Sequence, residues 1–157
     1  MVLPARQTTR VKSIVELRDG GTAEWDYAFA PMSVTLTLDD EIDVSRGAML
    51  VHPRNVPPGP SSFVAMLAWT GDGAMDPGLT YVLKHTTRSV NARVERIEYR
   101  VDINRLNRTP ARALQLHEIG RVVFRAQQTL FMDTYRKNRF TGSFILVHPQ
   151  TNDTVPA

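Results

Sequence analysis

Short segments rich in Val, Ile, Leu, Thr and aromatic residues follow one another along the 157-residue chain, with turn residues between them. The clearest alternation covers residues 33–38, where Val34, Leu36 and Leu38 share one face and threonines lie on the other, as in a half-exposed antiparallel strand. Because such segments recur about every ten to twenty residues, the sequence predicts an all-β sandwich or barrel. The segments expected to form strands are residues 11–17, 33–38, 49–51, 63–70, 80–85, 121–126 and 142–147, with a turn over residues 18–21.

One segment in the second half of the chain fits either a helix or a strand. Its apolar residues lie at helical spacing, at positions 90, 94, 97 and 101. They also alternate in two runs, with a slip in phase after Val94. A β-bulge near Glu95–Arg96, which adds one residue to a strand, would absorb that slip. Periodicity leaves both structures open, and we favour the strand.

A proline-rich stretch divides the chain. Residues 53–62 contain four prolines and one glycine, a composition that does not form a regular element and is typical of a semi-rigid linker. We therefore expect a first domain over residues 1–52, a linker over residues 53–61 and a second domain over residues 62–157.

Several classes of active site are excluded by residues that the sequence lacks. Without cysteine there is no zinc ribbon or thiol nucleophile, and without a glycine-rich loop ending in Gly-Lys-Ser/Thr there is no phosphate loop for a nucleoside triphosphate. The four histidines form no i, i+4 pair, and the acidic run Asp39–Asp43 lacks the glycine and glutamate of a calcium loop. No serine lies in a Gly-x-Ser-x-Gly elbow. We expect no catalytic, cofactor-binding or metal-binding residue in this chain.

The sequence predicts a cytoplasmic protein with no membrane partner. Its longest apolar runs, such as residues 63–69, are far too short to cross a bilayer, and its first residues lack the pattern of a signal peptide. The absence of cysteine also fits a reducing compartment.

Arginine dominates the positive charge of the chain. The net charge is only +3, but 16 of the 19 basic residues are arginine, and seven of these lie between positions 88 and 112. Guanidinium groups form bidentate contacts with phosphates and carboxylates, so the bias fits an anionic partner; a genomic preference for arginine codons is the simpler explanation. The interspersed glutamates also fit a solvent-exposed face that compensates its own charge. The candidate partner-binding residues are Arg93, Arg96, Arg100, Arg136 and Arg139.

Five motifs follow one another in a specific order. They are residues 39–47 (DDEIDVSRG) followed by residues 50–51, residues 84–88 (KHTTR), residues 92–102 (ARVERIEYRVD), residues 118–122 (EIGRV), and residues 138–139 with residues 141–145. In order and spacing they resemble the GTPase subunit of bacterial ATP sulfurylase (sulfate adenylyltransferase), which belongs to the elongation-factor-Tu-like GTPases. The likeness extends over nearly the whole chain.

The resemblance implies two β-barrels of the translation-factor type. Residues 1–52 would form part of a domain 2 barrel, and residues 62–157 a Greek-key domain 3 barrel in which the ambiguous segment is a strand. The family's GTPase domain, which binds GTP and magnesium, would lie outside this chain, so no GTP contact is assigned to any residue. Some members of the family also carry an adenylylsulfate kinase domain.

The resemblance also implies a non-catalytic role in sulfate activation. In the family, GTP hydrolysis drives adenylyl transfer from ATP to sulfate, and a separate small subunit performs that transfer. The barrels would dock and couple to the small subunit, and the chain would be inactive alone. The alternative is an arginine-rich barrel that binds RNA, as related translation-factor barrels do; a truncated product with no role of its own is a third reading.

An incomplete barrel over residues 1–52 would leave unpaired strand edges and exposed apolar side chains. We therefore expect this part of the chain to associate with a second copy or with another chain, or to be partly disordered.

Overall fold

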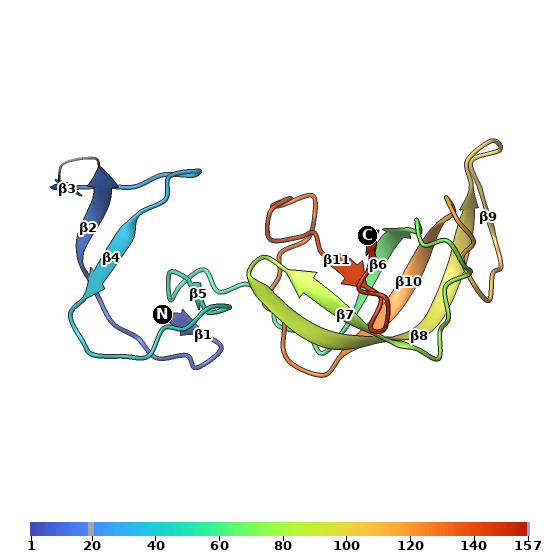
Figure 1. The fold of residues 1–157 in the computed structure, drawn as a ribbon, viewed down its shortest axis with the longest axis horizontal. Helices are drawn as coiled ribbons and strands as arrows, with labels where there is room; N and C mark the ends of the chain where they lie inside the picture. The colour runs from blue at the N-terminus through green and yellow to red at the C-terminus, as the bar shows by residue number, and fades with distance from the viewer. Residues whose placement is uncertain (19–20, 157) are drawn as a thin grey trace. The chain divides into compact units, whose positions relative to one another are not determined.

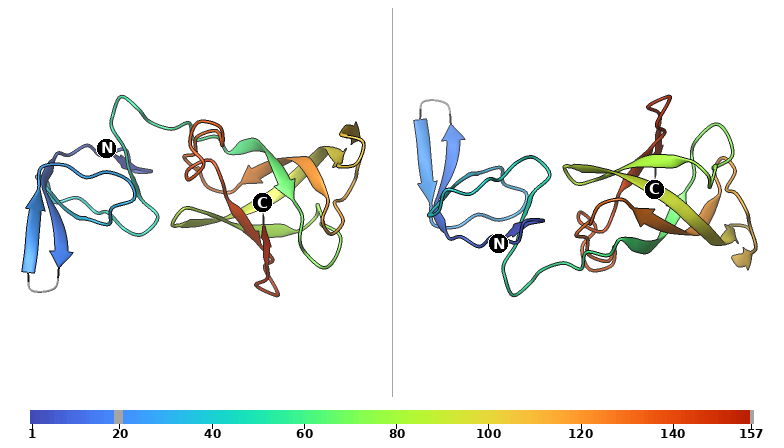
Figure 2. Two further views of the ribbon diagram at one scale, coloured as in Figure 1. Left: turned by 90° about the horizontal axis from the view of Figure 1, so that it is seen from above. Right: turned by 90° about the horizontal axis from the view of Figure 1, so that it is seen from below.

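The computed structural model describes residues 1–18 and 21–156, and this part of the chain forms strands and no helix. It divides into two compact units, Met1–Val56 and Pro57–Ala157 (Figures 1 and 2). In the first unit the strands are β1 (Val2–Leu3), β2 (Val11–Arg18), β3 (Gly21–Trp25), β4 (Thr35–Leu38) and β5 (Met49–Leu50). In the second they are β6 (Ser62–Ala68), β7 (Thr80–His85), β8 (Arg88–Asp102), β9 (Asn107–Thr109), β10 (Ile119–Ala126), β11 (Ile145–Val147) and β12 (Thr154–Pro156).

The second unit is built on one strongly curved antiparallel sheet. Its strands lie in the order β12-β11-β7-β8-β10-β6, and β9 pairs with the far end of β8. Figure 2 shows the long β8 bending across the unit, so that the sheet wraps around its own inner face. The predicted all-β class with antiparallel, barrel-like sheets is confirmed.

Aromatic rings fill the centre of the second unit. Phe124 of β10 is fully buried and lies between Phe63 and Phe144, with ring centroids 5.7 Å and 5.6 Å away. Phe63 and Phe144 also meet edge to face at 5.6 Å. Aliphatic side chains from β6, β7 and β11 complete this core, among them Leu67, Leu83 and Leu146. The alternation of β10 therefore places its even-numbered residues on the inner face.

Strand β8 settles the ambiguous segment as a strand. Its register against β10 shifts twice, so that neither Glu95 nor Glu98 has an opposite residue on β10. The expected bulge near Glu95–Arg96 is confirmed, and a second one lies at Glu98. The first bulge lets Val94 and Ile97 both turn inward, opposite Phe124 and Val122. A spacing of three between two inward residues imitates a helical turn, which explains the ambiguity of the sequence.

The first unit has little core. A three-stranded sheet, β3-β2-β4, lies beside the two-residue pair β1–β5, and among the described residues β3 and β4 each pair on one side only. Val2 and Leu3 are its only buried hydrophobic residues in the described part. Several large apolar side chains are exposed: Val11, Leu17, Tyr27 and Phe29. Such a sheet has edges and apolar faces open for pairing with another chain.

The proline-rich stretch has two parts. The boundary between the units falls after Val56. Beyond it the chain lies against the second unit, because Met132 donates its backbone N–H to the Pro58 carbonyl at 3.1 Å and Ala126 donates to the Ser61 carbonyl at 2.8 Å. A Cβ atom on Gly59 would lie 2.7 Å from the Thr129 side chain and 2.8 Å from the Phe131 ring, so a larger residue there would have to displace these side chains.

Candidate protein-interaction surface

Three of the five candidate arginines lie on β8 and differ in their surroundings. Arg93 is exposed, opposite Thr80 of β7 and Arg125 of β10. Arg96 is also exposed and contacts Glu98 at 3.4 Å. Arg100 is half-buried, forms an ion pair with Glu118, and its Nε donates to the Thr109 hydroxyl at 3.3 Å. Arg100 therefore serves the packing of β8, β9 and the turn before β10.

The charge of this face is balanced across strands. Glu95 accepts a hydrogen bond from Arg125 at 2.5 Å and one from the Ser62 hydroxyl at 3.1 Å, and these bonds lower the pKa of Glu95. Glu98 lies 2.7 Å from Arg121, whose pKa is raised by a hydrogen bond with Tyr99 and by the charge of Glu98. The bulged glutamates thus pair with arginines of β10. Arg93 has no ion pair within the described residues.

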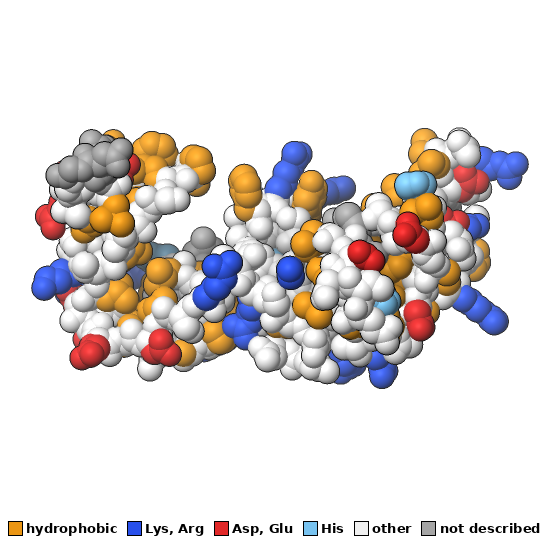
Figure 3. Space-filling model, in the orientation of Figure 1, with side chains coloured by type: hydrophobic (Ala, Val, Ile, Leu, Met, Phe, Trp, Pro, Cys, Tyr) orange, Lys and Arg blue, Asp and Glu red, His pale blue; other side chains and the backbone are white. Residues whose placement is uncertain are grey.

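The other two candidates, Arg136 and Arg139, lie in the loop that precedes β11. We call residues 133–143 the knob loop. It carries three basic residues against one aspartate, and two of its aromatic side chains are exposed, Tyr135 at 56% and Phe140 at 86%. The Arg139 guanidinium lies over the Tyr135 ring at 5.7 Å from its centroid. Figure 3 shows hydrophobic and basic side chains projecting together over this loop.

Side-chain bonds close the knob loop at its base. The Asp133 carboxylate, only 11% exposed, accepts hydrogen bonds from Lys137 Nζ at 2.7 Å and from the Thr141 hydroxyl at 3.0 Å. The Asp133 N–H donates to the Thr141 carbonyl at 3.2 Å. That carbonyl also contacts Nε2 of His85, a buried residue of β7, at 2.9 Å. Because a carbonyl only accepts, His85 carries its proton on Nε2 and ties the loop to the sheet.

Gly142 makes the closure possible. A Cβ atom at this position would lie 2.6 Å from both the N and the Cα of Tyr135 and 2.7 Å from the Asn138 carbonyl oxygen. All three are backbone atoms, so only glycine allows the two sides of the loop to approach this closely. The loop is therefore tightly closed at its base, with its aromatic side chains exposed to solvent.

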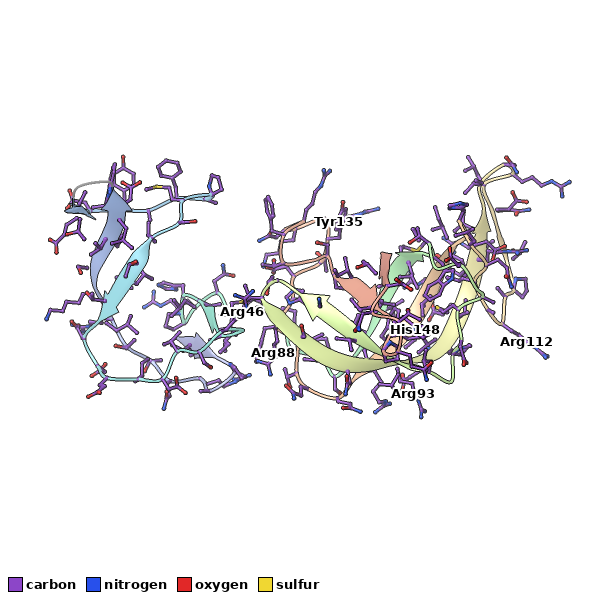
Figure 4. All side chains as sticks on the ribbon, in the orientation of Figure 1. Arg46, Arg88, Arg93, Arg112, Tyr135 and His148 are labelled. Carbon is purple, nitrogen blue, oxygen red and sulfur yellow. The ribbon has the colours of Figure 1, made fainter. Side chains whose placement is uncertain are left out.

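The five candidate arginines do not form one surface. Figure 4 shows Arg93 and Tyr135 at opposite edges of the second unit. Sequence analysis missed Phe140 and Asp133, which present and fix the knob loop. It also missed Arg121 and Arg125, which balance the β8 glutamates. The sequence gives no signal that Phe140 is exposed, because it has the same parity as Phe144 and Leu146, which face inward at β11.

The Asp133 carboxyl should titrate below the ordinary aspartate range. Its hydrogen bond with Lys137, followed by the one with Thr141, lowers its pKa in the folded chain. Its contribution to the closure of the loop is then fully present above the unfolded-state pKa of about 4 and is lost as the pH falls through the lowered folded-state value. A carboxyl carbon NMR titration measures this pKa directly, and a midpoint at or above the ordinary aspartate value would contradict the assignment.

Replacing Asp133 with asparagine should speed amide exchange at Thr141 and Gly142, because the loop loses the carboxylate that closes its base. Asp72→Asn, on a separate loop, should leave the exchange of these two amides unchanged.

The described residues offer no metal centre, since no three His, Asp or Glu side chains among them lie close enough to hold an ion. Over the same residues, no helix is present that could cross a membrane.

Comparisons with known proteins match this architecture. A protein-family model described as "GTP-eEF1A C-terminal domain-like" matches residues 62–157. The chain is 50% identical over 154 residues to sulfate adenylyltransferase subunit 1 of Bacteroides fragilis, covering 98% of this chain and 32% of that protein. It is also 50% identical over 156 residues to the bifunctional enzyme CysN/CysC of Rhodopirellula baltica, covering 99% of this chain and 24% of the relative.

A solved structure shares the fold. The crystal structure of Sup35 complexed with GDP superposes with a TM-score of 0.85 at 18% identity, over 99% of this chain and 38% of Sup35. This likeness concerns the fold alone. The chain spans about a quarter to a third of the length of its curated relatives named above. The resemblance to sulfate adenylyltransferase subunit 1 found in the sequence motifs is confirmed.

Proposed function

Since the chain belongs to the GTP-eEF1A C-terminal domain-like family, we propose that it is the non-catalytic β-barrel region of a sulfate adenylyltransferase GTPase subunit. Its role is to dock and couple to the catalytic small subunit, which transfers the adenylyl group of ATP to sulfate and releases pyrophosphate. The observation that carries this proposal is the 50% identity to a sulfate adenylyltransferase subunit 1 over 98% of the chain. The name of that relative, subunit 1, implies a partner subunit in its complex.

The exposed side chains of the second unit support a role in docking to a protein rather than in catalysis. Nucleotide contacts belong to a GTPase domain in the family, so neither GTP nor magnesium is assigned to residues of this chain. Two features of the second unit suit a protein partner: the exposed aromatic and basic side chains of the knob loop, and the exposed Arg93 on β8. The first unit, with its open sheet edges, also offers a surface for a second copy of the chain or for another chain.

RNA binding is the second candidate function. It is favoured by the exposed arginines of β8, which could contact phosphates, and by the translation-factor fold shared with Sup35. The balance of Glu95 with Arg125 and of Glu98 with Arg121 speaks against it, because these ion pairs reduce the positive charge that phosphates would meet.

Salt dependence separates the two functions. The immobilised chain is exposed to the sulfate adenylyltransferase small subunit encoded in the same genome, and to a single-stranded RNA oligonucleotide, at 50 mM and 200 mM salt. We expect saturable binding of the small subunit that weakens by less than tenfold at the higher salt, and only weak RNA binding. RNA affinity that is strong at low salt and falls by about 1,000-fold or more would favour the RNA-binding function, since phosphate contacts release counterions.

A further inference from the structure

We propose that the knob loop is a preformed plug, whose Phe140 side chain inserts into an apolar pocket rimmed by carboxylates on a folded protein partner. The inference rests on the proposed function in one respect: the partner meant here is the catalytic small subunit. It assigns the contact to a loop of eleven residues, 133–143, and within it to Phe140, Arg136 and Arg139.

The exposure of Phe140 is the first observation behind this inference. At 86%, its side chain is the most exposed large hydrophobic group in the described part of the chain. A phenylalanine in water loses the free energy that its burial would provide, and rigid aromatic anchors that fill a pocket contribute a large share of binding energy at interfaces. Tyr135, 56% exposed, widens the apolar surface at the same tip.

The second observation is the network of hydrogen bonds that closes the loop. The Asp133–Lys137 and Asp133–Thr141 bonds close its base, and the Ser143 hydroxyl donates to the Arg139 carbonyl at 2.7 Å. The backbone N–H groups of Lys137 and Asn138 both donate to the Thr134 carbonyl, at 2.9 Å and 3.0 Å. A loop held in this way loses little conformational entropy on binding, so more of the contact energy appears as affinity.

The basic residues of the knob loop indicate which groups would surround the proposed pocket on the partner. Arg136, Lys137 and Arg139 all lie within the four residues before Phe140, and Asp133 already compensates Lys137 through the 2.7 Å contact. The two arginines are left to meet anionic groups, and guanidinium groups form bidentate pairs with carboxylates. The Arg139 contact with Tyr135 holds that guanidinium beside the aromatic tip, within reach of the same partner surface.

The geometry favours a protein over a nucleic acid. Single-stranded nucleic acids bind along grooves in which several cations follow the phosphates and successive aromatic rings stack on bases. Here the aromatic and basic side chains gather on one projecting loop, and Arg93 lies at the opposite edge of the unit (Figures 3 and 4). A highly exposed phenylalanine with two arginines in the same short loop matches a pocket on a folded surface.

Isothermal titration calorimetry tests the inference. The full chain is titrated against the small subunit from the same genome, and the parent is compared with Phe140→Ala, Arg139→Ala and Leu106→Ala. Leu106 is the matched control, because it is 83% exposed at the tip of another loop, between β8 and β9. Since Phe140 and Leu106 make few contacts with the core, both variants should unfold at the parent's midpoint. We expect Phe140→Ala to weaken binding at least tenfold, Arg139→Ala to weaken it more at 50 mM than at 200 mM salt, and Leu106→Ala to leave it within twofold.

The outcomes separate this inference from the proposed function. If the parent chain binds the small subunit and Phe140→Ala binds equally well, the plug is wrong and the docking function stands. If the parent chain itself does not bind, the docking function and the plug both fall. If the parent chain binds the RNA oligonucleotide and Phe140→Ala does not, the proposed contact with a protein pocket is wrong and Phe140 instead stacks on a base.

Discussion

Replacing Phe124 with alanine should lower the free energy of unfolding of the second unit by about 3–5 kcal/mol. The ring is fully buried between Phe63 and Phe144, so its removal leaves a cavity lined by two aromatic rings that cannot close over it. Two strands and the segment before β11 lose a common contact, because Phe63 lies on β6, Phe124 on β10, and Phe144 immediately before β11. Urea denaturation followed by Trp69 fluorescence, in a Trp25→Phe background, reports on this unit alone.

Met66→Ala is the matched control for Phe124→Ala. Met66 lies on β6, the neighbouring strand, but on its outer face, where the side chain is 49% exposed. We expect its loss to cost less than about 1 kcal/mol, since little apolar surface is returned to water. Equal costs for the two substitutions would mean that the inner face of the sheet is not the core of this unit.

Replacing Gly142 with alanine should destabilise the knob loop, by about 1–3 kcal/mol. The added Cβ would lie 2.6–2.7 Å from three backbone atoms of Tyr135 and Asn138, and backbone atoms cannot move aside as the end of a side chain can. The loop would have to open, which breaks the contact of the Thr141 carbonyl with His85 and the bonds of Asp133. Amide exchange at residues 134–143 should increase, while exchange in β8 and β10 should be unchanged.

Gly73→Ala is the corresponding control. A Cβ atom on Gly73 meets nothing within 4 Å, so alanine should be accepted there without loss of stability. If Gly142→Ala exchanges its loop amides as slowly as the parent, the close approach around Gly142 does not hold the loop. Binding of the small subunit to Gly142→Ala provides a second readout of this prediction, because an opened loop can no longer present Phe140 in a fixed position.

The strands predicted from the sequence are those with a recognisable run of apolar and β-branched residues. β7 was predicted over the residues that it occupies, 80–85, because apolar residues alternate along it. β3 and β9 were missed, since their polar residues follow no alternation and their order comes from pairing with β2 and β8. β1 and β12 have two and three residues, too few for any period to appear. The turn expected over residues 18–21 includes Asp19 and Gly20, which lie outside the described residues.

The start of β11 shows a second limit of prediction from the sequence. A strand was expected to begin at Gly142, but β11 begins at Ile145. Residues 142 and 143 instead complete the knob loop, whose closure depends on the bond of Asp133 with Thr141, eight residues further along the chain, and on His85 of β7. Neither contact can be read from the local sequence. For the same reason Phe140, flanked by polar residues, did not stand out as a candidate.

The candidate arginines were found by residue type, and the structure gives them unequal positions. Arg100 pairs with Glu118, and Arg96 with Glu98, whereas Arg93, Arg136 and Arg139 keep their charge free of ion pairs among the described residues. The bulges of β8 decide this, because they set Glu95 and Glu98 against β10 arginines that lie more than twenty residues further along the chain. Pairing between strands cannot be inferred from spacing along one strand.

Size-exclusion chromatography with light scattering of the chain mixed with the small subunit of sulfate adenylyltransferase tests docking most directly. Docking predicts a single peak whose mass equals the sum of one chain and one small-subunit protomer, or a whole multiple of that sum. It also predicts that the peak persists at 200 mM salt. Two separate peaks, each with the mass that its component has alone, would contradict the proposal that these barrels dock the catalytic subunit.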